Sequence, residues 1–237
     1  MYYIISLLIL IAISVLIICF MGKFTNTKLT NLIFVLIVVV CHWVHVIKIY
    51  FDVGAHDWNF LNTLPVANIS PFMFCIVPFI FILPSKIKKY FLILISLLSV
   101  GMFLSPIISC SYFASINYKF HFSFLLDFVA HLSLFLLGIY LVKSKQIELK
   151  LKDSVVSGSI ILCVGGGMLI LNCIFDTSFW GLSLNGKHSI YNQVIVSNSY
   201  LSALLYFTGL IVVLILGFCF NKLLNFKCHL KSKKELQ

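Results

Sequence analysis

The stretch "HFSFLLDFVAHLSLFLLGIYLV", residues 121–142, is long and apolar enough to cross a lipid bilayer, yet it contains an aspartate and a histidine. A hydrocarbon core about 30 Å thick is crossed by roughly 20 apolar residues, because a helix rises about 1.5 Å per residue. Asp127 and His131 are four positions apart and therefore share one face of that helix. An ionisable group at membrane depth must face a partner or a cavity, so this stretch predicts both a fold and a site.

The composition of the whole chain agrees with a membrane fold. Hydrophobic residues make up 61% of the 237 residues and charged residues 10%, whereas soluble domains have roughly 45–50% and about 25%. A soluble domain of this length cannot bury so much apolar surface, so lipid must be the main solvent. The sequence therefore predicts an all-α, multi-pass membrane protein that forms a single domain over residues 1–237.

Seven stretches meet the length requirement for a membrane-spanning helix. The third is the least regular, because it contains Pro65, Pro71 and Pro78, and such helices tend to line protein or a cavity. The predicted spans are residues 2–21, 30–51, 63–83, 90–108, 121–142, 155–175 and 199–221.

The lysines predict the orientation of these seven spans. Most of them follow spans one, three, five and seven, whereas the opposite side carries only Lys48, Lys119 and Lys187. Cytoplasmic loops are enriched in basic residues, so we expect the N-terminus outside the cell membrane and the C-terminus in the cytoplasm. The net charge of +10 is then explained by membrane anchoring, and no nucleic-acid partner is expected.

The polar residues within the spans are predicted to share one depth, in the outer half of the membrane. His42 and His45 are three positions apart and lie on one face of the second span. Each residue alone is often satisfied by a neighbouring helix, and Asn172 near the outer end of span six suits that structural role. Together they predict a polar pocket that opens toward the outer leaflet, lined by His42, His45, Asn68, Ser70, Asp127 and His131.

Within this set, Asp127 and His131 have the spacing of an acid–base pair. A carboxylate that holds one ring nitrogen of a histidine fixes the tautomer and makes the other nitrogen a better base. A serine or cysteine near that nitrogen would complete an activated nucleophile. Helix geometry alone does not choose among Ser70, Thr63 and Cys75.

Three segments resemble the YwaF-like family of bacterial integral membrane proteins. They are "LPVANIS" (64–70), "DFVAHLSLFLLGIYLV" (127–142) and "LNCIFDTSFWGLSL" (171–184). This family looks related to eukaryotic seven-span phospholipid acyltransferases and, more distantly, to the androgen-induced-gene lipid hydrolases. The resemblance implies a nucleophile just after the Leu-Pro of span three and a base at the span-five histidine, which His131 matches. The cysteine of the acyltransferase-like members is absent between Leu64 and Ser70.

These observations predict acyl transfer or ester hydrolysis on a membrane lipid. His131 would act as the base, Asp127 would orient it and Ser70 would be the nucleophile, with His42, His45 and Asn68 binding the headgroup or oxyanion. One alternative is a non-catalytic membrane protein that binds a lipid or small ligand, as a transporter, receptor or immunity protein does.

A metal-dependent lipid hydrolase is the other alternative, since three histidines and an aspartate can hold zinc. Seven-span ceramidase-like proteins, however, take two histidines from the last span, and residues 199–221 contain none. We therefore expect no metal and no other cofactor. The sequence leaves the oligomeric state open.

Overall fold

The structure is a computed structural model that describes residues 2–53, 68–115, 121–175, 180, 182 and 199–234. Within these ranges the chain forms seven α-helices and no β-strand. Six of the helices are long and apolar enough to cross a membrane, which supports a multi-pass membrane protein. Their bounds are α1 Tyr2–Phe20, α2 Thr27–Val53, α4 Ser85–Ser115, α5 His121–Lys143, α6 Leu151–Phe175 and α8 Ser199–Lys234.

The seventh helix, α3, occupies the region of the third predicted span and is short. It covers Ile69–Ile76 and continues as a 3₁₀ segment over Val77–Phe81. These thirteen residues extend about 22 Å, which is less than the roughly 30 Å of a hydrocarbon core. The first five residues of the predicted span, 63–67, lie outside the described residues. Six of the seven predicted spans are thus matched by full-length helices, and the third by a shorter one.

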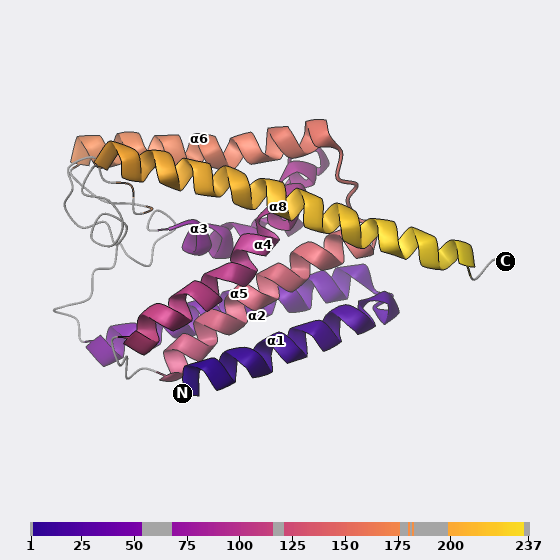
Figure 1. Cartoon of the computed structure of the whole chain (residues 1–237), viewed down its shortest axis with the longest axis horizontal. Helices are drawn as coiled ribbons and strands as arrows, with labels where there is room; N and C mark the ends of the chain where they lie inside the picture. The colour runs from indigo at the N-terminus through magenta and orange to yellow at the C-terminus, as the bar shows by residue number, and fades with distance from the viewer. Residues whose placement is uncertain are drawn as a thin grey trace.

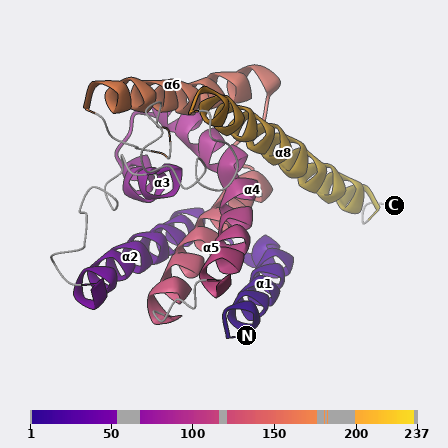
Figure 2. The ribbon, with the colours of Figure 1, turned by 60° about the vertical axis from the view of Figure 1, so that its left-hand side comes forward.

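The helices run along a common direction and form two outer pairs around a central pair (Figure 1). Helices α1 and α2 lie on one side, α6 and α8 on the other, and α4 and α5 between them. The short α3 lies between α2 and α6 in both views (Figure 2). Helix α1 begins at one end of the bundle, and α8 ends beyond the other.

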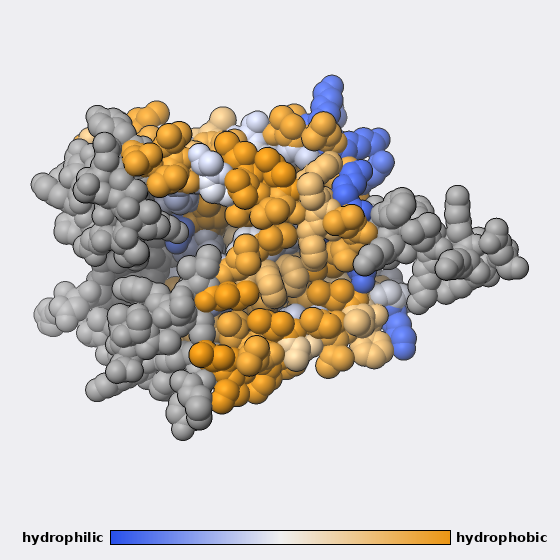
Figure 3. All heavy atoms as spheres, in the orientation of Figure 1, coloured by the Kyte–Doolittle hydropathy of each residue, from blue (hydrophilic) through white to orange (hydrophobic). Residues whose placement is uncertain are grey.

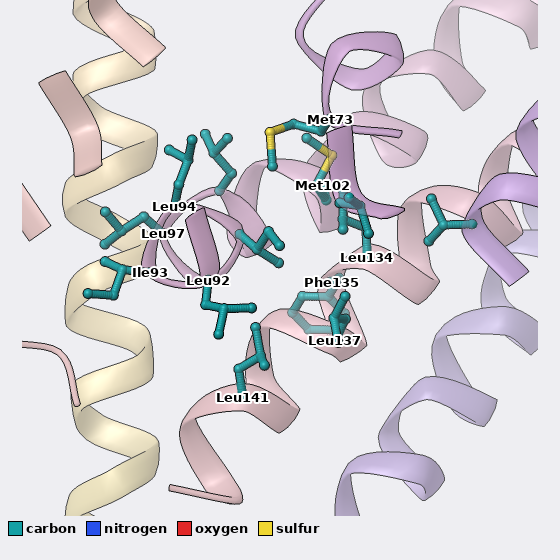
Figure 4. Packing of buried hydrophobic residues seen from close by; sticks show 14 of the residues in the cluster. Met73, Leu92, Ile93, Leu94, Leu97, Met102, Leu134, Phe135, Leu137 and Leu141 are labelled. Atoms are coloured by element: carbon teal, nitrogen blue, oxygen red, sulfur yellow. The ribbon is translucent and has the colours of Figure 1, made fainter. Parts of the chain in front are cut away.

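Helix α5 is the centre of the bundle. It packs against α1, α2 and α4, and every residue from Ala130 to Val142 is buried. A helix that is apolar on all sides is the kind found in the interior of a membrane bundle. Figure 4 shows leucines of α4 and α5 meeting, with Met73 of α3 and Met102 of α4 pointing toward each other. The most buried helix is therefore the one that carries the Asp127–His131 pair.

Helix α4 crosses α8 very closely. A Cβ atom added at Gly217 of α8 would collide with the backbone carbonyl of Leu97 in α4. Asn221 Nδ2 donates to the carbonyl of Ser96 at 2.8 Å, to that of Gly217 at 2.9 Å and to Ser99 Oγ at 3.3 Å. We call these residues, Ser96, Ser99, Gly217 and Asn221, the α4–α8 crossing. Close approach at a small residue together with interhelical amide bonds is typical of membrane helix packing.

The surface of the bundle suits a lipid environment. On the face shown in Figure 3, apolar side chains form a broad band across the middle, and hydrophilic ones gather at the end toward which α8 runs. Exposed apolar side chains include Leu8 and Leu16 of α1 and Leu204 and Ile215 of α8. Lipid can cover these side chains at no cost in free energy, whereas water cannot. The exposed lysines near the hydrophilic end are Lys23, Lys28, Lys86, Lys89, Lys145, Lys150, Lys152 and Lys222.

Candidate active site

His131 lies at the centre of a polar cluster inside the bundle. Its side chain is buried, with 5% of its surface exposed. Its Nδ1 atom is 2.9 Å from the backbone carbonyl oxygen of Asp127 and 3.4 Å from the Asp127 carboxylate. A carbonyl oxygen can only accept a hydrogen bond, so we assign the proton to Nδ1, which donates to Asp127. The other nitrogen, Nε2, then presents a lone pair, as a general base requires.

Two serine hydroxyls converge on this lone pair. Ser70 Oγ of α3 is 2.9 Å from His131 Nε2, and Ser105 Oγ of α4 is 3.2 Å from the same atom. A neutral imidazole accepts one hydrogen bond in the plane of its ring, so the two hydroxyls share one acceptor. The shorter contact makes Ser70 the better placed donor. We call these four residues, Ser70, Ser105, Asp127 and His131, the His131 cluster.

Ser70 reaches His131 because α3 begins immediately before it. Asn68 has an extended backbone, with φ −158° and ψ 167°, and its side-chain oxygen accepts from the Ile69 N–H at 2.8 Å. This is the arrangement of an N-cap residue. Pro71 has no N–H to satisfy, which suits the first turn of a helix. Ser70 is therefore held in the first turn of α3, where backbone N–H groups point away from the helix and have no intrahelical acceptor.

Phe74, one turn further along α3, connects His131 to His42. Its ring centroid is 5.0 Å from that of His131, edge to face, and 5.0 Å from that of His42. His42 is buried, and its Nε2 atom has no hydrogen-bond partner among the described residues. His45, three residues further along α2, is half-buried. The structure thus brings side chains of α2, α3 and α5 together around Phe74.

Asn68 occupies a different place from the other predicted residues. Its side chain is exposed and caps α3, so it acts on the site by fixing where the helix begins. Of the other candidate nucleophiles, Thr63 lies outside the described residues. Cys75 is half-buried, and no hydrogen bond joins its thiol to the described part of the chain. Ser70 is therefore the candidate nucleophile that the structure brings to His131.

Ser105 was not predicted from the sequence, although it is as much a part of the cluster as Ser70. A serine in a membrane span is ordinary, and its partner here comes from another helix. The one local signal is Pro106, which follows Ser105 inside α4. Proline removes a backbone hydrogen bond from the helix interior, and membrane helices often have such an interruption beside a functional site.

Two described residues that follow α6, Trp180 and Leu182, are buried against the bundle. Trp180 is 1% exposed and packs edge-on against Phe72, with ring centroids 5.7 Å apart. The backbone of Trp180 has a φ of 60°, which is unusual for a residue other than glycine. Asn172 of α6 donates a side-chain hydrogen bond to the carbonyl oxygen of Leu182, which is also buried. Asn172 thus has a structural role, although its partner is Leu182 and not the neighbouring helix that was predicted.

The hydrogen bonds of the cluster involve both ring nitrogens of His131. No group of three His, Cys, Asp or Glu side chains with the geometry of a metal site occurs in the part of the chain that the structure describes. Both ring nitrogens of His131 face protein groups, namely Asp127 and the two serines. The Ser70 hydroxyl, the His131 imidazole and the Asp127 carboxylate, 3.4 Å from Nδ1, thus lie in the order of the groups in a Ser-His-Asp triad.

Comparisons of the chain with protein families, curated proteins and solved structures gave no match.

Proposed function

We propose that this protein is an integral membrane enzyme that transfers or hydrolyses an acyl group of a membrane lipid. Ser70 is the nucleophile, His131 the general base, and Asp127 the residue that orients the imidazole. The observation that carries this proposal is the 2.9 Å contact between Ser70 Oγ and His131 Nε2, on a ring whose Nδ1 is held by Asp127. A hydroxyl within hydrogen-bond reach of an oriented base is what nucleophilic catalysis by serine requires.

The proposed reaction has two steps with balanced atoms. Ser70 Oγ attacks the carbonyl carbon of a lipid ester while its proton moves to His131 Nε2, and the alcohol portion leaves with a proton. An acyl-serine remains. Water or a second lipid alcohol then attacks this acyl group, giving its proton to His131, and the acid or the new ester departs while Ser70 regains its proton. His42 and His45 supply polar groups for the headgroup or the developing oxyanion, as predicted from the sequence.

The proposed topology places this chemistry in the outer half of the cell membrane. His131 is about 10 Å along α5 from Phe124 and about 18 Å from Lys143, at about 1.5 Å per residue. The lysine-rich end of the bundle is the nearer to Lys143, and the positive-inside rule assigns it to the cytoplasm. With α3 counted as part of a seventh crossing, the N-terminus lies outside and the C-terminus inside. In Figure 1 the N-terminus and the C-terminus of the chain lie at opposite ends of the bundle, which supports an odd number of membrane crossings.

A membrane lipid is the proposed substrate because the cluster is surrounded by apolar helices. The neighbours of His131 on α5, Ala130 and Leu132, are buried, and the outer surfaces of the helices are apolar. A substrate that already resides in the bilayer can reach this depth sideways without crossing a water-filled path. Kinship with the YwaF-like family, proposed from the sequence, agrees with a lipid substrate.

One observation favours a second function, the binding of a ligand without chemistry. The buried His42 Nε2 lacks a hydrogen-bond partner among the described residues, and such a group costs free energy unless something bonds to it. A lipid headgroup or a small polar ligand at His42 would satisfy it. The two functions differ in whether the chain changes the lipid that it binds.

Lipid analysis of a strain that lacks the gene would separate these functions. The strain is complemented with the wild-type gene, with Ser70→Ala or with His131→Ala, and expression in membranes is matched. We expect one lipid class to change on deletion and to be restored by the wild type alone. A lipid composition that does not respond to deletion, or that both variants restore, would favour the binding function.

A further inference from the structure

The hydroxyl of Ser105 makes its hydrogen bond to His131 and not to a carbonyl of its own helix. Serines within helices commonly bond to the carbonyl oxygen four residues earlier. Ser157 and Ser159 of α6 do so, at 2.9 Å each. Ser105 instead directs its hydroxyl across the helix interface to His131 Nε2, at 3.2 Å. Such a contact is unnecessary for a general base that already has Ser70 at 2.9 Å.

The chemistry of ester cleavage leaves a task for a second hydroxyl. When Ser70 attacks, its proton moves to Nε2, and this N–H still points at Ser70 Oγ. An alkoxide leaving group on the other side of the tetrahedral carbon must receive a proton before it can depart. Because Ser105 Oγ also lies within hydrogen-bond distance of Nε2, it can accept from the newly formed N–H. Its own proton is then available to a neighbouring oxygen.

We propose that Ser105 relays the proton from His131 to the oxygen of the leaving alcohol. This proposal rests on the acyl-transfer function proposed above. As the bond from the carbonyl carbon to the alcohol oxygen breaks, the Ser105 hydroxyl gives its proton to that oxygen and takes the proton of His131 Nε2. Ser105 ends unchanged, His131 returns to its neutral form, and the released alcohol carries one proton. In the second step the same relay runs in reverse and removes the proton of the incoming water or alcohol.

The surroundings of the two serines agree with this division of roles. Ser70 and Ser105 are half-buried whereas His131 is buried, so the hydroxyls lie on the side of the ring that a substrate can approach. They come from separate helices, α3 and α4, and therefore approach Nε2 from different directions. One hydroxyl can then face the carbonyl carbon while the other faces the departing oxygen.

Leaving groups that need no proton provide the test. The full-length protein in detergent micelles is treated with a fluorophosphonate, which expels fluoride, and with 4-nitrophenyl octanoate, which expels a stable phenolate. It is also given ethyl octanoate, whose ethoxide must be protonated. First-turnover rates are compared for the wild type, Ser105→Ala, Ser105→Thr and the control Ser159→Ala. Ser159 is an exposed α6 serine bonded to its own helix.

We expect Ser105→Ala to react with the fluorophosphonate and with 4-nitrophenyl octanoate within about twofold of the wild-type rates. Cleavage of ethyl octanoate should fall about 100-fold, which is at the low end of the contribution of general acid catalysis. Ser105→Thr, which keeps a hydroxyl, should recover most of that loss, and Ser159→Ala should match the wild type. If Ser105→Ala is not monodisperse, Ser105→Val replaces it, because it has nearly the shape of the Ser105→Thr variant and has no hydroxyl.

The outcomes that would overturn the relay differ from those that would overturn the enzyme. Equal losses for both esters in Ser105→Ala would give Ser105 a positioning role only and overturn the relay. So would a wild-type protein that reacts with the fluorophosphonate but cleaves ethyl octanoate no faster than Ser105→Ala. A wild-type protein that does not react with the fluorophosphonate would remove the proposed function itself and the relay with it.

Discussion

Two polar clusters lie within this apolar bundle, and they use their hydrogen-bonding groups differently. At the α4–α8 crossing, Asn221 donates to two backbone carbonyls and Ser96 donates to the carbonyl of Gly138 at 2.9 Å. The bonds of Asn221 to Ser96 and of Ser96 to Gly138 join helices, whereas the bond to Gly217 lies within α8. None of these groups ionises, and Asn221 Oδ1 lacks a partner among the described residues. In the His131 cluster, an imidazole held by a carboxylate and a backbone carbonyl receives two hydroxyls on one nitrogen.

This difference separates polar side chains that hold membrane helices together from polar side chains that are suited to a reaction. Amide and hydroxyl bonds to backbone carbonyls strengthen helix packing, at roughly 0.6 kcal/mol per bond on average. A buried histidine and aspartate strengthen helix packing little more than an amide would, and each costs free energy at membrane depth. The crossing is therefore expected to matter for folding and the His131 cluster for activity. Substitutions in the two regions should separate these properties.

The largest expected effect is the loss of nucleophilic reactivity in His131→Ala. Without the base, Ser70 keeps its proton, and reaction with a fluorophosphonate should slow about 1,000-fold. Loss of the buried ring also lowers the unfolding temperature in detergent, so the rate is measured on the folded fraction alone. Ser99→Ala is the matched control, because this serine belongs to the α4–α8 crossing and its loss should leave reactivity within about twofold. A His131→Ala protein that reacts at the wild-type rate would contradict the role of base.

The second effect is on folding, in Gly217→Ala. The added methyl group would collide with the Leu97 carbonyl in α4, and overpacking of this kind costs about 3 kcal/mol. Equilibrium unfolding in mixed micelles would measure it, with the folded fraction keeping its reactivity toward the fluorophosphonate. Gly167→Ala is the control, because a Cβ atom there would meet nothing within 4 Å. Equal stability of the two variants would show that the close α4–α8 approach is absent.

A smaller effect on reactivity is expected for Asp127→Asn. The backbone carbonyl of Asp127, 2.9 Å from Nδ1, keeps the imidazole in the required tautomer when the carboxylate is gone. The remaining loss is the electrostatic stabilisation of the imidazolium, so the fluorophosphonate rate should fall about 10- to 100-fold, less than in serine hydrolases whose aspartate side chain alone holds the ring. A loss as large as that of His131→Ala would mean that the carboxylate, not the backbone, fixes the ring.

The smallest effect is expected for Asn221→Ala. It removes three side-chain bonds at 2.8 to 3.3 Å and should cost about 1 kcal/mol of stability, given the modest strength of interhelical bonds in membranes. Unfolding in mixed micelles would measure this, with Ser159→Ala as the control on the lipid-facing surface. Reactivity of the folded protein should stay at the wild-type level. A loss of reactivity without a loss of stability would mean that the two clusters are coupled.

Most of the fold could be predicted because the length of an apolar run limits the helix that it forms. All six long helices begin within five residues of their predicted starts, and α8 continues past its predicted end at residue 221 to Lys234. The third span could not be predicted as well. Its helix begins only at Ile69, where Asn68 caps it, and hydropathy does not distinguish a cap from a span.

The site could be predicted where residues share a helix and not where they meet across helices. The four-residue spacing of Asp127 and His131 predicted that they are in contact. Their estimated depth in the membrane suggested Ser70 and His42 as neighbours. Depth does not determine which side of each helix faces the others, so Asn68, at a suitable depth, turned out to be an exposed cap. Ser105 has no helical partner in its own span, and only the packing of α4 against α5 brings it to His131.

The most direct test of the central claim is to find which atom a fluorophosphonate modifies. The full-length protein is labelled in detergent micelles, and its peptides are examined by mass spectrometry for wild type, Ser70→Ala and His131→Ala. We expect one phosphonate adduct, on Ser70, in the wild type and in the control Ser99→Ala. We expect no adduct in Ser70→Ala or His131→Ala over the same labelling time. An adduct on another residue, or a wild-type protein that forms none, would contradict the assignment of Ser70 as a nucleophile activated by His131.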